Sequence, residues 1–222
     1  MLLNIFKDYH GAIIQGLGTT LVISGCAWFI GITGGVIFGY IAQKSESFSK
    51  VLSVSSFLLM SIPVLVLLFW LHYPAQAIMG IVINPLITTI VTLSIVNIVL
   101  TGEIIKKTLD DFPFQYVSVA RVCGIPEKKI FLKIKLPIIF RQVLPSIIVL
   151  QISIMQMSLF GSLISVEEIF RIAQQINSQI YRPVEIYTAL ALLFVAVALP
   201  LNILAHYLRG KYTRNLSEEK ND

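Results

Sequence analysis

Charge is the scarcest property of this sequence. Only 13% of its 222 residues are Asp, Glu, Lys or Arg, whereas 56% are hydrophobic, and the mean hydropathy is +0.82. A soluble domain of this length could bury only part of so much apolar surface, while a bilayer can cover the remainder. The composition therefore excludes an ordinary soluble protein and indicates an integral membrane protein.

The sequence also lacks the motifs of common catalytic and metal chemistry. It has no G-x-x-x-x-G-K-[ST], so ATP hydrolysis by the P-loop route is excluded, and no H-E-x-x-H, G-x-S-x-G or C-x-x-C. Its two cysteines, Cys26 and Cys123, are far apart, and the three histidines are dispersed. We expect no enzyme, no metal site and no cofactor bound by this chain, which leaves transport, signalling or scaffolding.

Long apolar runs are what the sequence has in abundance. A transmembrane helix needs about 20 mostly apolar residues. Five stretches qualify, at about 19–42, 51–71, 77–101, 143–166 and 184–207. We therefore predict an all-α integral membrane fold, a single domain over 1–222 with five transmembrane helices. It begins with an external lead over 1–18 and ends in a tail over 208–222.

Basic residues are unevenly distributed over the predicted loops. Of 17 Lys and Arg residues, only Lys7, Arg171 and Arg182 lie outside the loop after the first stretch, the loop after the third and the tail. Positive residues concentrate on the cytoplasmic side of membrane proteins. This predicts an external N-terminus and a cytoplasmic C-terminus.

The first two stretches contain residues with special backbone properties. The first has Gly31, Gly34, Gly35 and Gly39, and small residues let membrane helices approach closely. Packing within the chain is the favoured use of these glycines, ahead of dimerisation. The second contains Pro63, which a membrane helix tolerates when neighbours satisfy the freed carbonyl.

The loop over 103–142 is too well patterned for a passive linker. Pro113 and Pro126 are predicted to bracket a short helix, Gly124 to form a turn, and Pro137 to end a second helix with an apolar face. Such an element suits docking to a partner protein. An amphipathic helix lying on anionic lipid fits the lysines equally well. The residue pattern by itself leaves both open.

Polar residues inside apolar spans are candidates for a transport pathway, because they are expensive in a bilayer. They are Asn97 in the third stretch and Gln151, Gln156 and Ser158 in the fourth. The alternative is hydrogen bonding between helices, worth on the order of 1 kcal/mol per pair. Glu103, near the cytoplasmic end of the third stretch, is either a gate or a solvated helix end.

The loop resembles a known signature. Ser118-Val119-Ala120-Arg121-Val122-Cys123-Gly124, followed by Leu136-Pro137 and Leu144-Pro145, is similar to the "EAA" motif of binding-protein-dependent ABC importer permeases. In that family the loop inserts its short helix into a groove of the cytoplasmic ATPase subunit, which favours partner docking here. The resemblance implies ATPase contacts at Ser118, Val119, Ala120, Arg121, Gly124, Pro126 and Pro137.

Further segments resemble the polar amino-acid branch of the family. They are Gly16–Leu21, Gly102–Ile104, Ser162–Glu168, Arg182–Tyr187 and Leu199–Leu201. The resemblance implies import of His-, Gln-, Glu- or Arg-type amino acids or similar solutes in a bacterial cytoplasmic membrane. It also implies a second permease subunit, an ATPase dimer that binds ATP and magnesium, and an external solute-binding protein. Glu167, Glu168, Arg171 and Arg182 would lie beneath that binding protein.

One departure from the family concerns the substrate. Gln156, Met157 and Ser158 stand where the family has a charged pair. This indicates either a less charged solute or the less substrate-engaged half of a heterodimer. The competing class is a secondary transporter or channel without an ATPase, which predicts charged residues within the spans for ion coupling. The apolar stretches contain almost none.

Overall fold

The computed structural model describes the backbone of residues 2–217 and the side chains of residues 7–212 except residue 114. Within that range every regular element is helical. Four helices are long and apolar enough to cross a membrane, and a bent helix pair supplies a fifth span if counted as one. In chain order the elements are α1 (Leu2–Lys44), α2 (Glu46–Ser61), α3 (Val64–His72), α4 (Pro74–Met79), α5 (Pro85–Asp110), α6 (Phe114–Val122), α7 (Glu127–Ile130), η1 (Phe131–Lys135), α8 (Leu136–Met157), η2 (Ser158–Ile164), α9 (Ile169–Ile180) and α10 (Pro183–Ser217).

The first helix extends well beyond the apolar stretch at 19–42. Helix α1 begins at Leu2 and continues to Lys44, interrupted only at Tyr9, whose backbone angles (φ −113°, ψ 15°) are not helical. The predicted lead over 1–18 therefore lies within the same helix wherever it is described. No proline occurs before Lys44 to stop the helix.

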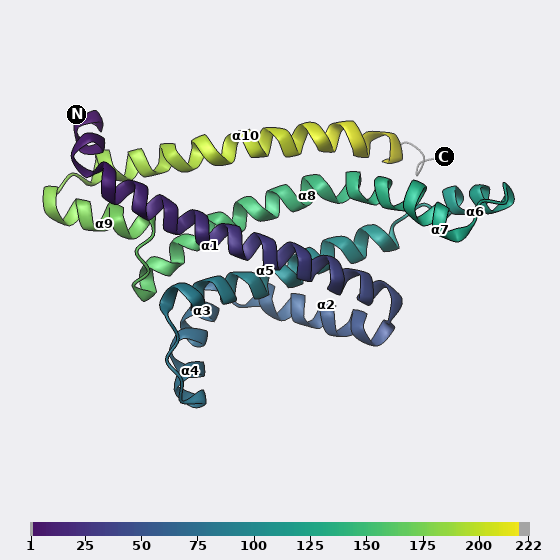
Figure 1. The fold of residues 1–222 in the computed structure, drawn as a ribbon, viewed down its shortest axis with the longest axis horizontal. Helices are drawn as coiled ribbons and strands as arrows, with labels where there is room; N and C mark the ends of the chain where they lie inside the picture. Colours follow the sequence, from purple (N-terminus) through teal and green to yellow (C-terminus); the bar gives the residue numbers. More distant parts are fainter. Residues whose placement is uncertain (1, 218–222) are drawn as a thin grey trace.

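The second apolar stretch is bent at Pro63. The sequence predicted one span across this proline, but the helices on either side, 46–61 and 64–79, meet at 97°. Ile62 is extended (φ −102°, ψ 124°) and Pro63 precedes the first residue of α3. A residue before proline is pushed out of the helical region. Beyond the bend, α3 packs against α5 through Leu68, whereas α4 projects away from the bundle (Figure 1).

Helix α5 is the centre of the bundle. In its most hydrophobic segment 56% of the residues are buried, whereas in the corresponding segment of α10 only 11% are. It packs against α1, α2, α3 and α8 around a core of Ile23, Ala27, Leu68, Leu93, Val96 and Ile154. Helix α10 runs beside α8 at the edge of the molecule (Figure 1). A span with so little buried surface presents most of its side chains to lipid or to another subunit.

Glycines allow α1 and α5 to pack without intervening side chains. A Cβ added at Gly35 would lie 2.4 Å from Thr101 Cβ, and one at Gly39 would lie 2.6 Å from the carbonyl oxygen of Gly102. Both distances are too short for any side chain. The glycine stripe therefore serves packing within the chain, as the sequence predicted.

Candidate functional site

Two amides meet at the centre of the bundle. Asn97 on α5 and Gln151 on α8 form a reciprocal pair: Asn97 Nδ2 donates to Gln151 Oε1 (2.8 Å), and Gln151 Nε2 donates to Asn97 Oδ1 (3.1 Å). Asn97 is fully buried and Gln151 nearly so. The sequence left two roles open for these residues, pathway lining and hydrogen bonding between helices, and the structure places the two amides against each other.

Helix α1 completes this amide network. Asn97 Nδ2 also donates to the carbonyl oxygen of Ala27 (2.9 Å), and the Trp28 indole donates to the carbonyl oxygen of Gln151 (2.9 Å). Thr101 donates to Asn97 Oδ1 (3.0 Å). The polar atoms of Asn97 and Gln151 are thus engaged within the chain, where they join α1, α5 and α8. Sequence reasoning missed Trp28 and Thr101, because nothing in their local pattern marks them as partners of residues far along the chain.

The end of α8 presents its polar side chains differently. Gln156 is exposed, Met157 is half-buried and Ser158 is fully buried, with its hydroxyl donating to the carbonyl oxygen of Met155 (2.7 Å). The helix tightens into the 3-10 segment η2 immediately afterwards. Of these three residues, only Gln156 offers a polar group to a solute or a neighbouring subunit.

Glu103 lies six residues beyond Asn97 on α5. It is partly exposed, yet its Oε1 atom is buried and has no hydrogen-bond partner among the described residues. The nearby Lys106 donates instead to Asp110 (2.8 Å). A buried carboxylate oxygen without a partner is unfavourable. Glu103 therefore retains an acceptor that a ligand or a second subunit can use.

The loop over 103–142 is largely helical. Helix α6 ends at Val122, and Gly124 then takes a left-handed conformation (φ 73°). Its turn is closed by the amide of Ile125, which donates to the carbonyl oxygen of Ala120 (3.1 Å). Pro126 directly precedes α7. The predicted helix–glycine–helix element is therefore present, and Gly124 occupies a position that favours glycine.

The prediction that Pro137 ends the second helix was wrong. Helices α7, η1 and α8 follow one another without interruption, and Pro137 lies in the first turn of α8. The preceding turn, Phe131–Lys135, is a π-helix. Because a π-turn shifts the hydrogen-bond register, it accommodates a residue that has no backbone donor.

The loop has its own small core and an apolar outer surface. Ala120 packs with Val117 and Ile130 and is buried, so its small side chain fits inside the loop. Val119 and Val122 lie on the opposite side of α6 and are exposed, Val122 to 89%. Val122 was not among the predicted contact residues. Its spacing of three from Val119 on a helix was the signal available in the sequence.

Helix α9 lies at the opposite end of the bundle (Figure 1), and a buried glutamate precedes it. Glu168 caps α9: its carboxylate oxygens accept from the backbone amides of Phe170 and Arg171 (both 2.8 Å). It is fully buried, and burial raises the pKa of its carboxyl group to about 7. Glu167 beside it is exposed, and Arg171 and Arg182 are partly exposed. Of the four charged residues that the resemblance assigned to this face, these three reach the surface.

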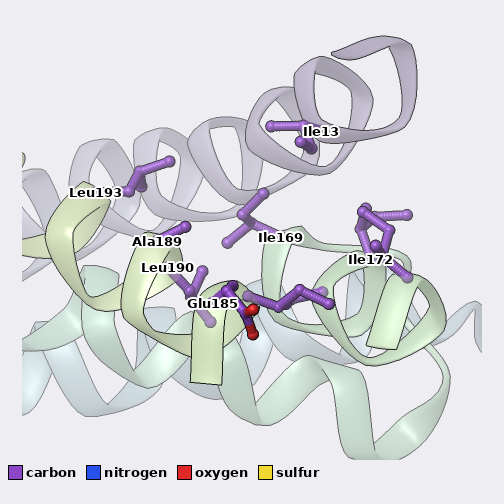
Figure 2. Close-up of a pocket in the computed structure, with 10 residues that line it drawn as sticks. Ile13, Ile169, Ile172, Glu185, Ala189, Leu190 and Leu193 are labelled. Atoms are coloured by element: carbon purple, nitrogen blue, oxygen red, sulfur yellow. The ribbon is translucent and has the colours of Figure 1, made fainter. Parts of the chain in front are cut away.

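An apolar hollow lies at the same end, between α1, α9 and α10 (Figure 2). Its walls are formed by Ile13, Ile169, Ile172, Ala173, Ile176, Ile186, Ala189, Leu190 and Leu193, with Glu185 as the one charged side chain among its lining residues. Hydrocarbon walls cannot replace the hydration of a polar solute. This hollow is therefore unsuited to hold one. No group of His, Cys, Asp or Glu side chains that could hold a metal ion occurs among the described residues.

The sequence is related to membrane components of importers. It is 23% identical over 195 residues to the nopaline transport system permease protein NocM of Agrobacterium fabrum, with 83% of this chain and 81% of that protein aligned. It is 19% identical over 216 residues to the arginine ABC transporter permease protein ArtQ of Haemophilus influenzae, with 95% and 97% aligned.

The fold matches a solved structure of the same kind. A chain in the crystal structure of an amino acid ABC transporter superposes with a TM-score of 0.82 over 95% of this chain and 98% of that chain, at 22% identity. Residues 31–214 match the family described as "Binding-protein-dependent transport system inner membrane component". The chain therefore belongs to this family of ABC importer permeases, whose members are membrane components and not enzymes.

Proposed function

We propose that this chain pairs with a second permease subunit to form the membrane pathway of an ATP-driven importer for amino acids or similar small polar solutes. The observation that carries the proposal is the match over residues 31–214, together with relatives named for arginine and nopaline transport. ATP and magnesium would be bound by a separate ATPase subunit, because this chain has no P-loop. An external solute-binding protein would deliver the solute.

The segment Phe114–Ile130 is the proposed contact with the ATPase. Its buried residues Val117, Ala120 and Ile130 give it a fixed shape, while Val119 and Val122 leave an apolar surface exposed. Arg121 bonds to Glu127 across the Gly124 turn (2.5 Å), which links α6 to α7. A rigid helix with an apolar outer side suits insertion into a groove of a partner protein. Closure of the ATPase dimer would move α8 through the continuous α7–η1–α8 helix.

A second permease subunit would supply the other wall of the pathway. Asn97 and Gln151 are occupied with each other in this conformation, so a solute would have to contact other polar groups. Exposed Gln156 and the unpartnered oxygen of Glu103 are the available candidates. An amide can hydrogen-bond both the carboxylate and the ammonium of an amino acid. A carboxylate suits the ammonium group alone.

The proposed orientation puts the Gly124 turn and the C-terminal end of α10 in the cytoplasm, and α9 outside. The surface charges Glu167, Arg171 and Arg182 would then face the solute-binding protein. Glu168 would act by fixing the position of α9, because its carboxylate is fully engaged by backbone amides. The uneven distribution of Lys and Arg supports this orientation.

Substitution at Gly124 tests the coupling role. Gly124→Leu places a side chain at φ 73°, where L-residues are strained by about 1–2 kcal/mol, although no atom lies within 4 Å of the new Cβ. The strain should misdirect α6 while leaving the membrane helices intact. We expect normal expression, loss of most transport in proteoliposomes and weaker co-purification of the ATPase. Gly124→Asn is the matched control, because Asn tolerates this conformation, and it should retain transport.

The competing functions predict other outcomes. A secondary transporter or channel has no ATPase partner, so neither substitution would affect co-purification of an ATPase. A loop that lies on lipid would bind it more strongly with an added leucine, and transport would not change. Parental transport by Gly124→Leu with the ATPase still bound would contradict the coupling role.

A further inference from the structure

Two cations from different helices share one aromatic ring at the end of the bundle where α10 terminates. The guanidinium carbon of Arg141, near the start of α8, lies 5.7 Å from the centre of the Tyr212 ring on α10. Lys211 Nζ lies 5.8 Å from the same ring and 5.8 Å from that of Tyr207. These distances are in the range of cation–π contacts. We call Arg141, Tyr207, Lys211 and Tyr212 the basic–aromatic cluster.

Within the described residues no ion pair neutralises the positive charge of the cluster. Three other basic side chains do have carboxylate partners: Lys50 pairs with Glu46, Lys106 with Asp110 and Arg121 with Glu127. No described carboxylate forms an ion pair with Arg141 or Lys211. Like charges near one another repel, most strongly beside low-dielectric hydrocarbon. An anion that contacts both cations would offset this repulsion.

The surroundings of the cluster are those of a lipid headgroup. Helix α10 has the smallest buried share of the four long apolar helices, and its side chains Ile203 and Leu204 are exposed just before the cluster. A bound acyl chain can lie along this apolar strip while its headgroup reaches the cations. Tyrosines at the membrane interface and basic residues on the cytoplasmic side favour anionic lipid. Free phosphate would gain nothing from the strip.

We propose that the basic–aromatic cluster binds the phosphodiester of an anionic phospholipid from the cytoplasmic leaflet. This rests on the proposed function only through the cytoplasmic orientation of the C-terminus. The arginine fork can donate two hydrogen bonds to the phosphate and Lys211 adds a point charge. The bound lipid joins the start of α8, which follows the ATPase-coupling segment, to the end of α10.

Lipid retention tests the proposal directly. The purified transporter in detergent is mixed with equal amounts of phosphatidylglycerol and phosphatidylcholine of identical acyl chains, and bound lipids are counted by native mass spectrometry. The parent should prefer phosphatidylglycerol. Arg141→Gln combined with Lys211→Gln should lower that preference about twenty-fivefold, since each basic residue contributes roughly fivefold near a membrane surface. The exchange Arg141→Lys with Lys211→Arg retains both charges and should retain most of the preference.

A second double variant separates the cluster from general surface charge. Lys44→Gln with Lys50→Gln removes two charges near the α1–α2 turn, outside the cluster, and should leave the preference unchanged. Equal losses in both double variants, or no preference in the parent, would overturn the proposal. Displacement of phosphatidylglycerol by millimolar inorganic phosphate would show a free-phosphate site and overturn it too. The measurement requires no transport, so failure here with normal import leaves the proposed function standing.

Discussion

At the residue scale, the most consequential contact is the amide pair of Asn97 and Gln151. Each amide in hydrocarbon needs several partners, and here the two supply them to each other, with help from Ala27 and Thr101. Truncating one amide leaves the other buried and unsatisfied. The pair joins three helices at one point. Residues that only line a pathway would not need to do so.

Substitution of this pair should therefore be strongly non-additive. Asn97→Leu or Gln151→Leu alone should destabilise the protein by about 1–3 kcal/mol, because a buried polar group loses its partner. The double variant should recover part of that loss, since neither amide remains. Thermal unfolding of the four proteins in detergent gives the coupling. Additive losses of stability would contradict a structural role for the pair. Unchanged stability with altered solute affinity would show instead that both residues line the pathway.

Two opposing effects set the pKa of the Glu168 carboxyl group. Its carboxylate accepts two backbone amides at the start of α9, which favours the charged form, while complete burial favours the neutral form. Burial dominates and raises the pKa of the carboxyl group to about 7. A solvated glutamate titrates near 4.5. Over the intervening pH range the folded chain retains a proton that the unfolded chain releases.

The stability contributed by Glu168 should therefore be greatest at low pH. It is fully present below about pH 4.5 and is lost as the pH rises through about 7. Because Gln does not titrate, the thermal midpoint of the parent minus that of Glu168→Gln should thus decrease as the pH is raised from about 5 to about 8. Glu167→Gln, its exposed neighbour, is the control and should show no such trend. A difference for Glu168→Gln that is constant with pH would refute this assignment.

At the element scale, α1 and α5 pack closely because glycines on α1 have no side chains at their contact. The glycines on α1 face Asn97, Thr101 and Gly102 on α5, so the two backbones come into direct contact. Close backbone approach is the main source of helix association in lipid, where no hydrophobic effect acts between helices. The same approach brings Asn97 within hydrogen-bonding distance of the Ala27 carbonyl oxygen.

A methyl group at Gly35 should separate these helices. The Cβ of Gly35→Ala would lie 2.4 Å from Thr101 Cβ and 2.9 Å from the carbonyl oxygen of Ile98, so the helices must shift. We expect a destabilisation of about 1–3 kcal/mol by overpacking, visible as a lower thermal midpoint in detergent. Gly25→Ala, on the same helix with no atom within 4 Å, should be neutral or slightly stabilising. Equal effects at both positions would point to helix propensity instead of packing.

At the scale of the whole molecule, charges are sorted to the two ends. Eight basic residues lie between Lys106 and Arg141 and others lie near the end of α10, whereas the α9 end has few. Figure 1 shows α6, α7 and the end of α10 at one end of the molecule and α9 at the other. Two opposite ends of different charge are what a fixed membrane orientation requires.

Labelling should locate these ends. In a background with Cys26 and Cys123 replaced by Ala, single cysteines at Lys50, Lys128 and Lys211 should react with an impermeant maleimide only from the cytoplasmic side. A cysteine at the exposed Gln179 on α9 should react only from outside. Reaction at Lys128 from outside would overturn the orientation and the ATPase-coupling role with it.

Several properties were determined by the sequence alone. Hydropathy is additive along the chain, so the apolar stretches predicted a helical membrane protein before any contact was known. The helix–glycine–helix element was predictable because α6 and its turn depend on neighbouring residues: Gly124 takes positive φ through local hydrogen bonds. The family resemblance followed from the same segment.

The tertiary structure decided which polar residues remain available. Asn97 and Gln151 are 54 residues apart, and only the packing of α5 on α8 makes them partners, which sequence spacing cannot reveal. Likewise Glu167 and Glu168 are alike in sequence, yet one is exposed and the other caps a helix in the interior. Pro63 lies between two helices that meet at 97°, whereas Pro137 lies in a helical run that continues through a π-turn. The partners and the burial of a side chain depend on neighbours from other helices, and these are fixed only once the helices have packed.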